Sequence, residues 1–371
     1  MIGSLANSGK ISGGAGGSGD TTGAVGRGGA GVVNSGTIKT LTNSGTILGG
    51  KGGSSIAGGT GGAGVANSGT VKTLTNNGTI SSGAGGNFGG ASGAGIRNSG
   101  AIGPLVNGGT IEGGLGASGG AMGDAIYSAG KHASIGPIAN SGSIVGNVVI
   151  DNQASVTANG GSGKTFGSWT GGTITIGAGN LTFASGNTAL GDNISVNGGK
   201  GTVFNNDPLM ISAPQTIAGS FDQSGSGLLD FGLASDTKGQ YGALDITRTA
   251  TLAGGLGIDL TGGFKLTTGE TFDILGFGSL AGSGFDALAL GGAACSSTVV
   301  DKWTCGGGVH LNEVIDATSL DLFVAHASAA FGPAGSPIPE PSTWAMLALG
   351  FLGLGGLGLR KRKRADEIGL R

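Results

Sequence analysis

Short runs of aliphatic residues, separated by asparagine and glycine, recur through the first third of the chain. Three apolar columns and one asparagine column keep the same steps from one recurrence to the next. A fixed period of this length, roughly 31 to 33 residues, predicts supersecondary units that stack on one another. The columns are Ile38, Val71, Ile102 and Ile135; Leu41, Leu74, Leu105 and Ile138; Ile47, Ile80, Ile111 and Ile144; and Asn43, Asn76, Asn107 and Asn140.

Glycine and the β-branched residues indicate what kind of unit is stacked. Glycine costs about 1 kcal/mol per residue in a helix interior, and no apolar stripe of helical period runs through the repeats, so helical repeats are excluded. Short β-branched segments followed by Asn-x-Gly turns favour strands. Stacking would place isoleucine over isoleucine in the core and asparagine over asparagine at a turn, where the side-chain amides can bond along the stack. The sequence therefore predicts an all-β chain, a parallel β-helix or β-solenoid, whose regular repeats occupy residues 1–150.

The glycine content raises the alternative of a flexible low-complexity tract, because 88 of the 371 residues are glycine. Disorder is typical of low hydrophobicity combined with high charge. Charged residues make up only 11% of this chain, and its mean hydropathy is +0.20. The glycine-rich stretches, such as residues 49–53, are interpreted as loops that return the chain to the next unit. Mobile loops on one face stay an alternative for these stretches.

Beyond about residue 150 the strict period fades while alternating strand segments, such as residues 173–176, continue between Gly-Asn turns. Larger, more aromatic segments follow from Thr216 to Phe272. Their pattern resembles the C-terminal part of autotransporter-like β-helix passengers, and the phenylalanines would suit a wider core and a protective cap. The predicted organisation is a less regular β-helix continuation and cap over 151–290, followed by a C-terminal β segment and linker over 291–335.

The C-terminal end of the chain has a different character. The segment Pro339-Glu340-Pro341-Ser342-Thr343-Trp344 leads into an uncharged apolar run, and Arg360-Lys361-Arg362-Lys363-Arg364 follows that run. As a helix, residues 344–359 would span about 24 Å, which is short of the roughly 20 residues of a comfortable transmembrane helix. Five consecutive cations favour the cytoplasmic side of a membrane. We therefore predict a short C-terminal transmembrane helix that acts as a temporary anchor.

This order of parts resembles the PEP-CTERM sorting signal of Gram-negative bacteria. The resemblance covers about a tenth of the chain, residues 336–364, and it implies recognition by an exosortase, a membrane-embedded processing enzyme. It assigns the sorting motif to Pro339, Glu340, Pro341, Ser342, Thr343 and Trp344, and the membrane stop to Arg360, Lys361, Arg362, Lys363 and Arg364. The tail at 365–371 departs from the pattern, because such signals usually stop soon after the basic cluster. An ordinary tail anchor without processing is the alternative.

Export makes two further features relevant. The general export route needs a basic segment followed by an apolar stretch. Residues 1–7 provide neither, so we expect a signal peptide upstream of the sequence given. In an exported protein, Cys295 and Cys305 are expected to form a disulfide that closes a short loop, worth about 2–3 kcal/mol. A reactive free thiol is the alternative.

Groups that could perform chemistry are sparse. Residues 1–150 carry seven basic and three acidic residues, whereas residues 151–330 carry six basic and fifteen acidic ones. No cluster of Lys and Arg outside the tail predicts a nucleic-acid partner. Because no His or Cys spacing typical of a metal site occurs, neither a metal nor a cofactor is predicted.

An enzyme that cleaves polysaccharide would need paired carboxylates for acid and base work. The best candidates are interpreted more simply as solvated groups beside turns or on outward strand faces. They are Asp222, Asp230, Asp236, Asp245, Asp259 and Asp273.

The function predicted from these features is that of an exported, non-enzymatic surface or extracellular-matrix protein. Residues 344–359 would hold it at the inner membrane until an exosortase-type enzyme processes it. Its repeated surface would then contact exopolysaccharide or neighbouring cells, as in a biofilm, because multivalency turns weak contacts into useful avidity. The alternatives are a β-helix enzyme acting on extracellular polysaccharide and an autotransporter-like adhesin, whose self-export the apolar C-terminal run does not favour.

Overall fold

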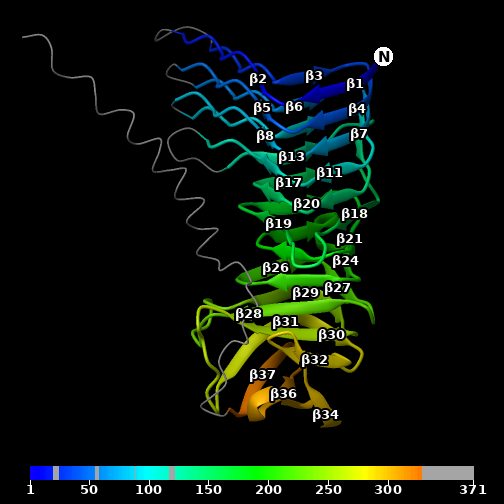
Figure 1. The fold of residues 1–371 in the computed structure, drawn as a ribbon, viewed down its shortest axis with the longest axis vertical. Helices are drawn as coiled ribbons and strands as arrows, with labels where there is room; N and C mark the ends of the chain where they lie inside the picture. The colour runs from blue at the N-terminus through cyan, green and yellow to red at the C-terminus, as the bar shows by residue number, and fades with distance from the viewer. Residues whose placement is uncertain (20–24, 55–57, 88, 117–121, 328–371) are drawn as a thin grey trace, which may run out of the picture.

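The structure, a computed structural model, describes residues 1–19, 25–54, 58–87, 89–116 and 122–327. Its strands wind into an elongated column that runs from the N-terminus at one end to β34 at the other (Figure 1). Nearly all of the regular structure is β, and the strands of successive turns pair in parallel, so the predicted β-helix is confirmed.

Three rows of parallel strands run along the column, and each turn after the first contributes to all three. The first row contains β3 (Val32–Asn34), β6 (Val65–Asn67), β9 (Ile96–Asn98), β13 (Asp124–Ser128), β17 (Asn147–Ile150), β20 (Thr173–Ile176), β23 (Asn193–Val196) and β26 (Pro214–Ala218). The second row contains β1 (Ile2–Asn7), β4 (Thr37–Asn43), β7 (Thr70–Asn76), β10 (Ala101–Ile102), β11 (Leu105–Asn107), β14 (Ser134–Ile135), β15 (Ile138–Asn140), β18 (Ser155–Asn159), β21 (Asn180–Ser185), β24 (Thr202–Asn205) and β27 (Ser220–Gln223). The third row contains β2 (Lys10–Ser12), β5 (Thr46–Leu48), β8 (Thr79–Ser81), β12 (Thr110–Glu112), β16 (Ser143–Val145), β19 (Gly167–Thr170), β22 (Thr188–Leu190), β25 (Pro208–Ile211), β28 (Leu228–Leu233), β30 (Gly255–Leu260) and β32 (Ala287–Leu290). Two long strands, β29 (Ala243–Thr251) and β31 (Thr271–Ala281), span the first and second rows together.

The predicted aliphatic columns form the core of the first part of the column. Ile38 pairs with Val71, and Leu41 with Leu74, in the register that the sequence repeat predicts. Every member of the three columns is exposed by 3% or less. A fourth buried column, which the sequence analysis did not identify, comes from the first row and contains Val32, Val65, Ile96 and Ile126. Burial of these columns supplies the main driving force for stacking one turn on the next.

The glycine-rich stretches, interpreted above as loops, form a second layer beside the column. We call this the glycine layer; among the described residues it comprises 13–19, 26–31, 49–54, 58–64, 82–87, 89–95 and 113–116. In Figure 1 it is the stack of blue and cyan segments that extends to the left of β2, β5 and β8. Each turn sends one segment out into the layer and one segment back.

The segments of the glycine layer follow a period of three positions. In residues 49–53, two adjacent glycines donate backbone hydrogen bonds to different neighbouring segments, while the third residue of the triplet, Lys51, is exposed. A period of three is typical of a polyproline II-type helix, which makes no internal backbone hydrogen bonds, so the bonds go to neighbours. They run from Gly49 to Ser81, from Gly50 to Gly29, from Gly52 to Ala84 and from Gly53 to Gly26, with N···O distances of 2.9, 2.7, 2.9 and 3.0 Å.

Close approach explains why these triplets are built from glycine. A Cβ atom added to Gly50 would lie 1.9 Å from the carbonyl oxygen of Gly14 in a neighbouring segment. The same collision recurs one turn later, because a Cβ on Gly83 would lie 1.9 Å from the carbonyl oxygen of Gly50. As at the axis of collagen, only glycine fits between backbones packed this closely.

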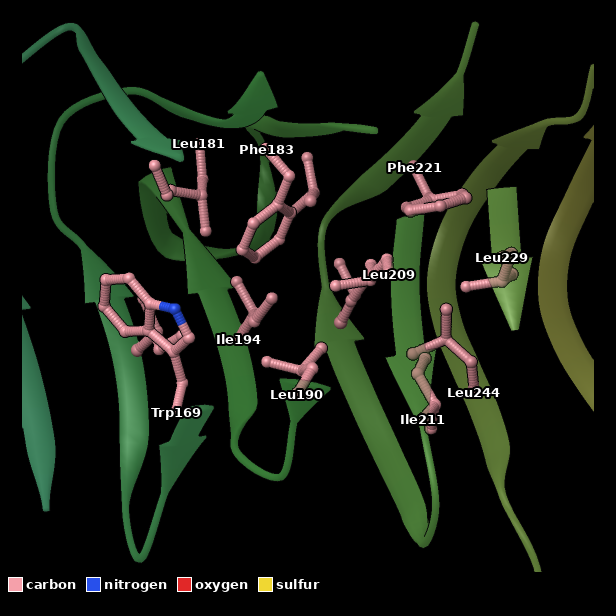
Figure 2. Packing of buried hydrophobic residues seen from close by; sticks show 14 of the residues in the cluster. Trp169, Leu181, Phe183, Leu190, Ile194, Leu209, Ile211, Phe221, Leu229 and Leu244 are labelled. Carbon is pink, nitrogen blue, oxygen red and sulfur yellow. The ribbon is translucent and has the colours of Figure 1, made fainter. Parts of the chain in front are cut away.

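After residue 150 the turns become shorter and larger side chains fill the interior. Ile174 pairs with Ile194, and Ile194 pairs with Ile217, so strand partners are closer in sequence here than Val65 and Ile96 are in the first part. The fading of the period therefore reflects the loss of the glycine layer, while parallel pairing continues. Figure 2 shows buried side chains of this part, including Trp169 and Phe221, gathered in the interior from different strands.

The far end of the column is closed by antiparallel strands. β31 pairs antiparallel with β37 (Ser319–His326), and β37 pairs in turn with β36 (Val309–Ile315). β33 (Ala293–Ala294), β34 (Ser296–Val299) and β35 (Lys302–Cys305) complete this cap. Leu311, Leu322 and Val324 are fully buried in the cap, so it shields the apolar interior at this end of the stack.

The predicted transmembrane helix at 344–359 lies outside the described residues. Within the part of the chain that the structure describes, no helix is long and apolar enough to cross a membrane.

Candidate functional site

Two of the six candidate aspartates come together on the third row. Asp230 on β28 and Asp259 on β30 lie on neighbouring turns, where Asp230 pairs with Gly257 and Asp259 pairs with Gly232. Glycine makes room for this arrangement, because a Cβ on Gly257 would lie 2.6 Å from Oδ1 of Asp230. The two carboxyl groups share a hydrogen bond.

Burial determines the charge of this pair. Burial, followed by the charge and hydrogen bond of Asp259, raises the pKa of Asp230 to about 8, and burial raises the pKa of Asp259 as well. The pair therefore holds a proton at neutral pH. Asp230 lies on the outward phase of β28, as expected, between the buried Leu229 and Phe231. Its Oδ1 is nevertheless shielded from solvent and has no hydrogen-bond partner among the described residues, so Asp230 is not the freely solvated group that the sequence predicted.

The other four candidate aspartates lie on separate elements. Asp222 is on β27, Asp245 on β29, Asp236 between β28 and β29, and Asp273 on β31, where it forms an ion pair with Lys238. Within the described ranges, no group of three or more His, Cys, Asp or Glu side chains is placed to hold a metal ion. Of the six candidates, Asp230 and Asp259 combine a protonated carboxyl group with a second carboxyl beside it, as in the acid and base pair that glycoside hydrolysis uses.

The cap contains the two cysteines and a buried acidic residue. Cys295 and Cys305 form a disulfide with a Cα–Cα distance of 4.3 Å. Nε1 of Trp303 donates a 2.8 Å hydrogen bond to Oε1 of Glu313, and both side chains are buried. Burial raises the pKa of Glu313 to about 7, although the bond from Trp303 acts in the opposite direction. Sequence reasoning missed this pair, because only the register of β35 on β36 brings the two residues together.

The asparagine column predicted from the repeats forms a ladder of hydrogen bonds, as expected. Each side-chain Nδ2 donates to Oδ1 of the asparagine on the next turn, with N···O distances of 2.8 Å at all four steps. This ladder joins Asn7, Asn43, Asn76, Asn107 and Asn140.

A second ladder, which the sequence analysis missed, follows the first row. It joins Asn34, Asn67 and Asn98 at 2.7 and 2.8 Å and ends on Oγ of Ser128. The available signal was the Asn-Ser-Gly that recurs at these three asparagines, each of which stands two residues after a valine or isoleucine. The two ladders fix the stacking of the turns at two corners and satisfy amides that, apart from that of the half-buried Asn7, are almost completely buried.

The residues expected to direct sorting, Pro339 to Trp344 and Arg360 to Arg364, lie outside the described residues. The last described strand, β37, ends at His326 in the cap. Residues 337–363 match the family model of the PEP-CTERM protein-sorting motif. The chain carries a PEP-CTERM sorting motif. Compared with curated proteins and with solved structures, it matches none.

The PEP-CTERM match confirms the assignment of the C-terminal segment made from the sequence. A PEP-CTERM motif implies export, anchoring at the membrane during sorting, and processing by an exosortase. The match begins at residue 337, after the end of β37 at His326, so it overlaps none of the described strands. The motif and the β-column therefore occupy separate stretches of the chain.

Proposed function

We propose that this protein is a non-enzymatic component of the cell surface or extracellular matrix, released by an exosortase-type enzyme and associated with exopolysaccharide. The observation that carries the proposal is the order of parts: a β-column with a C-terminal cap is followed by a PEP-CTERM motif. Such an order suits a protein whose body is delivered whole and whose tail is used only for delivery.

The build of the column supports a structural role. Parallel pairing, two asparagine ladders and the glycine layer give residues 1–150 bonds along the column at several positions in each turn. Side chains on the outer face of each turn then recur at a fixed spacing. A polymer with its own repeats can engage several of these positions together, and multivalency raises the avidity of weak contacts.

Sorting is tested by mass spectrometry of the C-terminal peptide from protein recovered at the surface of the native cell. We expect a mature end near Pro339-Glu340-Pro341, without the apolar run and the basic cluster. Pro339→Ala combined with Pro341→Ala should leave the intact chain in the membrane fraction, whereas the matched control Pro333→Ala should be processed normally. If wild-type membranes contained the chain with an intact end at Arg371, and no processed protein were recovered at the cell surface, the proposed release would be contradicted.

Association with exopolysaccharide is tested by fractionating the matrix of native cells and of a strain that makes no exopolysaccharide. We expect the processed protein to sediment with the polymer in the first strain and to stay in the soluble medium in the second. Equal distribution in both strains would contradict the association and leave a surface protein with another role.

The carboxyl pair favours a second candidate, a β-helix enzyme that cleaves extracellular polysaccharide. Asp230 would serve as the acid and Asp259 as the base or nucleophile, since the pair holds one proton at neutral pH. Their direct hydrogen bond ranks this candidate second, because the carboxyl groups of glycosidases lie roughly 5 Å or more apart. Release of new reducing ends from the native polymer, abolished by Asp230→Asn and by Asp259→Asn but not by Asp222→Asn, would establish this activity. Absence of any release by the wild-type protein supports the non-enzymatic role.

A further inference from the structure

A groove of about 370 Å³ runs where the glycine layer meets the first row of strands. Its alanine residues stack turn upon turn, because Gly31 donates its backbone N–H to Ala63 and Gly64 donates to Ala94. Small side chains thus leave a hollow along the column between two walls. Its volume lies within the range of small-molecule sites, roughly 300–1,000 Å³.

Two arginines line the groove from opposite walls. Arg27 is the outward residue of a Gly-x-Gly-Gly stretch in the glycine layer, and Arg97 projects from β9. Both are exposed, and neither forms a salt bridge among the described residues. Their guanidinium groups therefore stay available to an incoming anion, which such groups bind in a bidentate manner.

Polar and aromatic groups accompany the arginines. Thr60 and Ser92 place hydroxyl groups on the side of the glycine layer. Tyr127, one turn beyond Arg97 in the same row, has its ring centre 5.9 Å from the guanidinium carbon of Arg97. This combination offers hydrogen bonds to hydroxyl groups, a flat aromatic surface and two positive charges.

One carboxyl group also lines the groove. Asp124 on β13 is half-buried, and burial raises its pKa although a hydrogen bond with Asn147 opposes this. Two guanidinium groups against one carboxylate leave the groove positive, in agreement with the excess of basic residues in 1–150. The charge of the groove thus favours an anionic ligand.

The geometry points to a binding site for an acidic saccharide, a stretch of polymer that carries carboxylates on its sugar rings. This inference rests on the proposed association with exopolysaccharide and names the chemical class of the polymer. Because the lining residues come from successive turns, the saccharide lies lengthwise along the column. Arg27 and Arg97 bind its carboxylates, Thr60 and Ser92 bind hydroxyl groups, and Tyr127 contacts a ring face.

An acidic segment from a second copy of this chain would satisfy the arginines as well. The observations favour the saccharide, because hydroxyl-bearing residues and a tyrosine ring line the groove while its floor carries only alanine and glycine. Such a floor provides no pocket for the large apolar side chains that anchor protein–protein interfaces.

The test is isothermal titration calorimetry of the purified full chain with a tetramer of galacturonic acid, and with maltotetraose as a neutral control. We expect binding of the acidic tetramer that weakens with added NaCl, and none of maltotetraose. Arg27→Gln and Arg97→Gln should each raise Kd about tenfold, as expected for loss of one hydrogen-bonded charge. Asp124→Asn should lower Kd. Lys39→Gln and Lys72→Gln remove equal charge from exposed positions outside the groove and should leave Kd unchanged.

The outcomes separate the groove from the proposed function. If both arginine variants bound the acidic tetramer as tightly as the wild type, the assignment of the groove as the saccharide site would be wrong. The same conclusion would follow if the wild-type protein did not bind the tetramer. In either case sedimentation with the native polymer would keep the proposed function intact. If the wild-type protein bound no saccharide but formed a salt-sensitive dimer, and the arginine variants did not form it, the groove would be assigned to a second copy of the chain. Tetramer binding together with no association with the native polymer would contradict the proposed function instead.

Discussion

Residues 1–150 and the following part of the column use the same parallel pairing but fill space in opposite ways. In the first part, single aliphatic residues form the core and glycine triplets let backbones approach one another, so the missing side chains make the packing possible. In the second part, shorter turns enclose aromatic side chains such as Trp169 and Phe221.

This difference shows two routes to one architecture. Glycine loses more conformational freedom on folding than any other residue, so the glycine layer has to offset a large entropy cost with hydrogen bonds between segments. The aromatic part instead gains from burying large apolar surfaces. Adding a methyl group should therefore harm the first part, and removing side-chain volume should harm the second.

The largest effect is expected from emptying the aromatic interior. Phe221 is fully buried, and Phe221→Ala should lower the free energy of unfolding by about 4 kcal/mol, because transfer and cavity terms add. Urea denaturation followed by circular dichroism measures this loss. Thr182→Ala, at a half-buried position on β21, is the control and should change stability little. A Phe221 variant as stable as the wild type would mean that the interior can collapse around the gap.

The reverse change should break the glycine layer. Gly50→Ala places a methyl group where the carbonyl oxygen of Gly14 lies, so the free energy of unfolding should fall by about 3 kcal/mol. The control Gly14→Ala adds the same methyl group where nothing lies within 4 Å, so its melting temperature should match that of the wild type. Equal melting temperatures for both variants would show that the layer contributes nothing to folding.

A substitution in the asparagine ladder of the first part should lower the free energy of unfolding by less than either of these changes. Asn76→Ala removes an amide that accepts from Asn43 and donates to Asn107, which leaves buried polar groups unpaired. The expected loss is about 2 kcal/mol, measured by urea denaturation. The exposed neighbour provides a matched substitution, Asn77→Ala, which should have almost no effect. Equal losses from the two variants would contradict a structural role for the ladder.

The smallest effect concerns the cap and depends on pH. The pKa of Glu313 is about 7 in the folded protein, above its ordinary value of 4.5, so the folded state binds more protons between these values. Stability should therefore fall as pH rises through this window, by about 1 kcal/mol between pH 5 and pH 6 from this group. Glu313→Gln, which cannot ionise, should flatten the dependence by that amount. Identical pH profiles for variant and wild type would exclude Glu313 as the titrating group.

Two sequence periods are present in residues 1–150, and only the longer one, of one step per turn, predicted the fold. The columns through Ile38 and Asn43 recur at one step per turn, so stacking them predicted both the buried core and the ladder. The period of three in the glycine triplets was equally present in the sequence, yet it has meaning only when neighbouring segments pack side by side. The stretches were therefore interpreted as loops.

The candidate sites divide in the same way. Asp230 and Asp259 are well separated in a part of the chain without a fixed period, and nothing local indicates that they share a proton. Arg27 and Arg97 belong to different turns and to different layers, so the groove between them follows from the packing of the glycine layer against the strands.

The sequence by itself determined the β-helix of residues 1–150 and the PEP-CTERM motif. The first follows from a period that repeats one unit many times, and the second is a short linear signal whose residues are adjacent in the chain. Only the tertiary structure decided the glycine layer, the carboxyl pair, the Trp303–Glu313 contact and the groove. Each of these depends on which backbone segments lie next to one another, and on the burial that results, and both of these arise only when the turns stack.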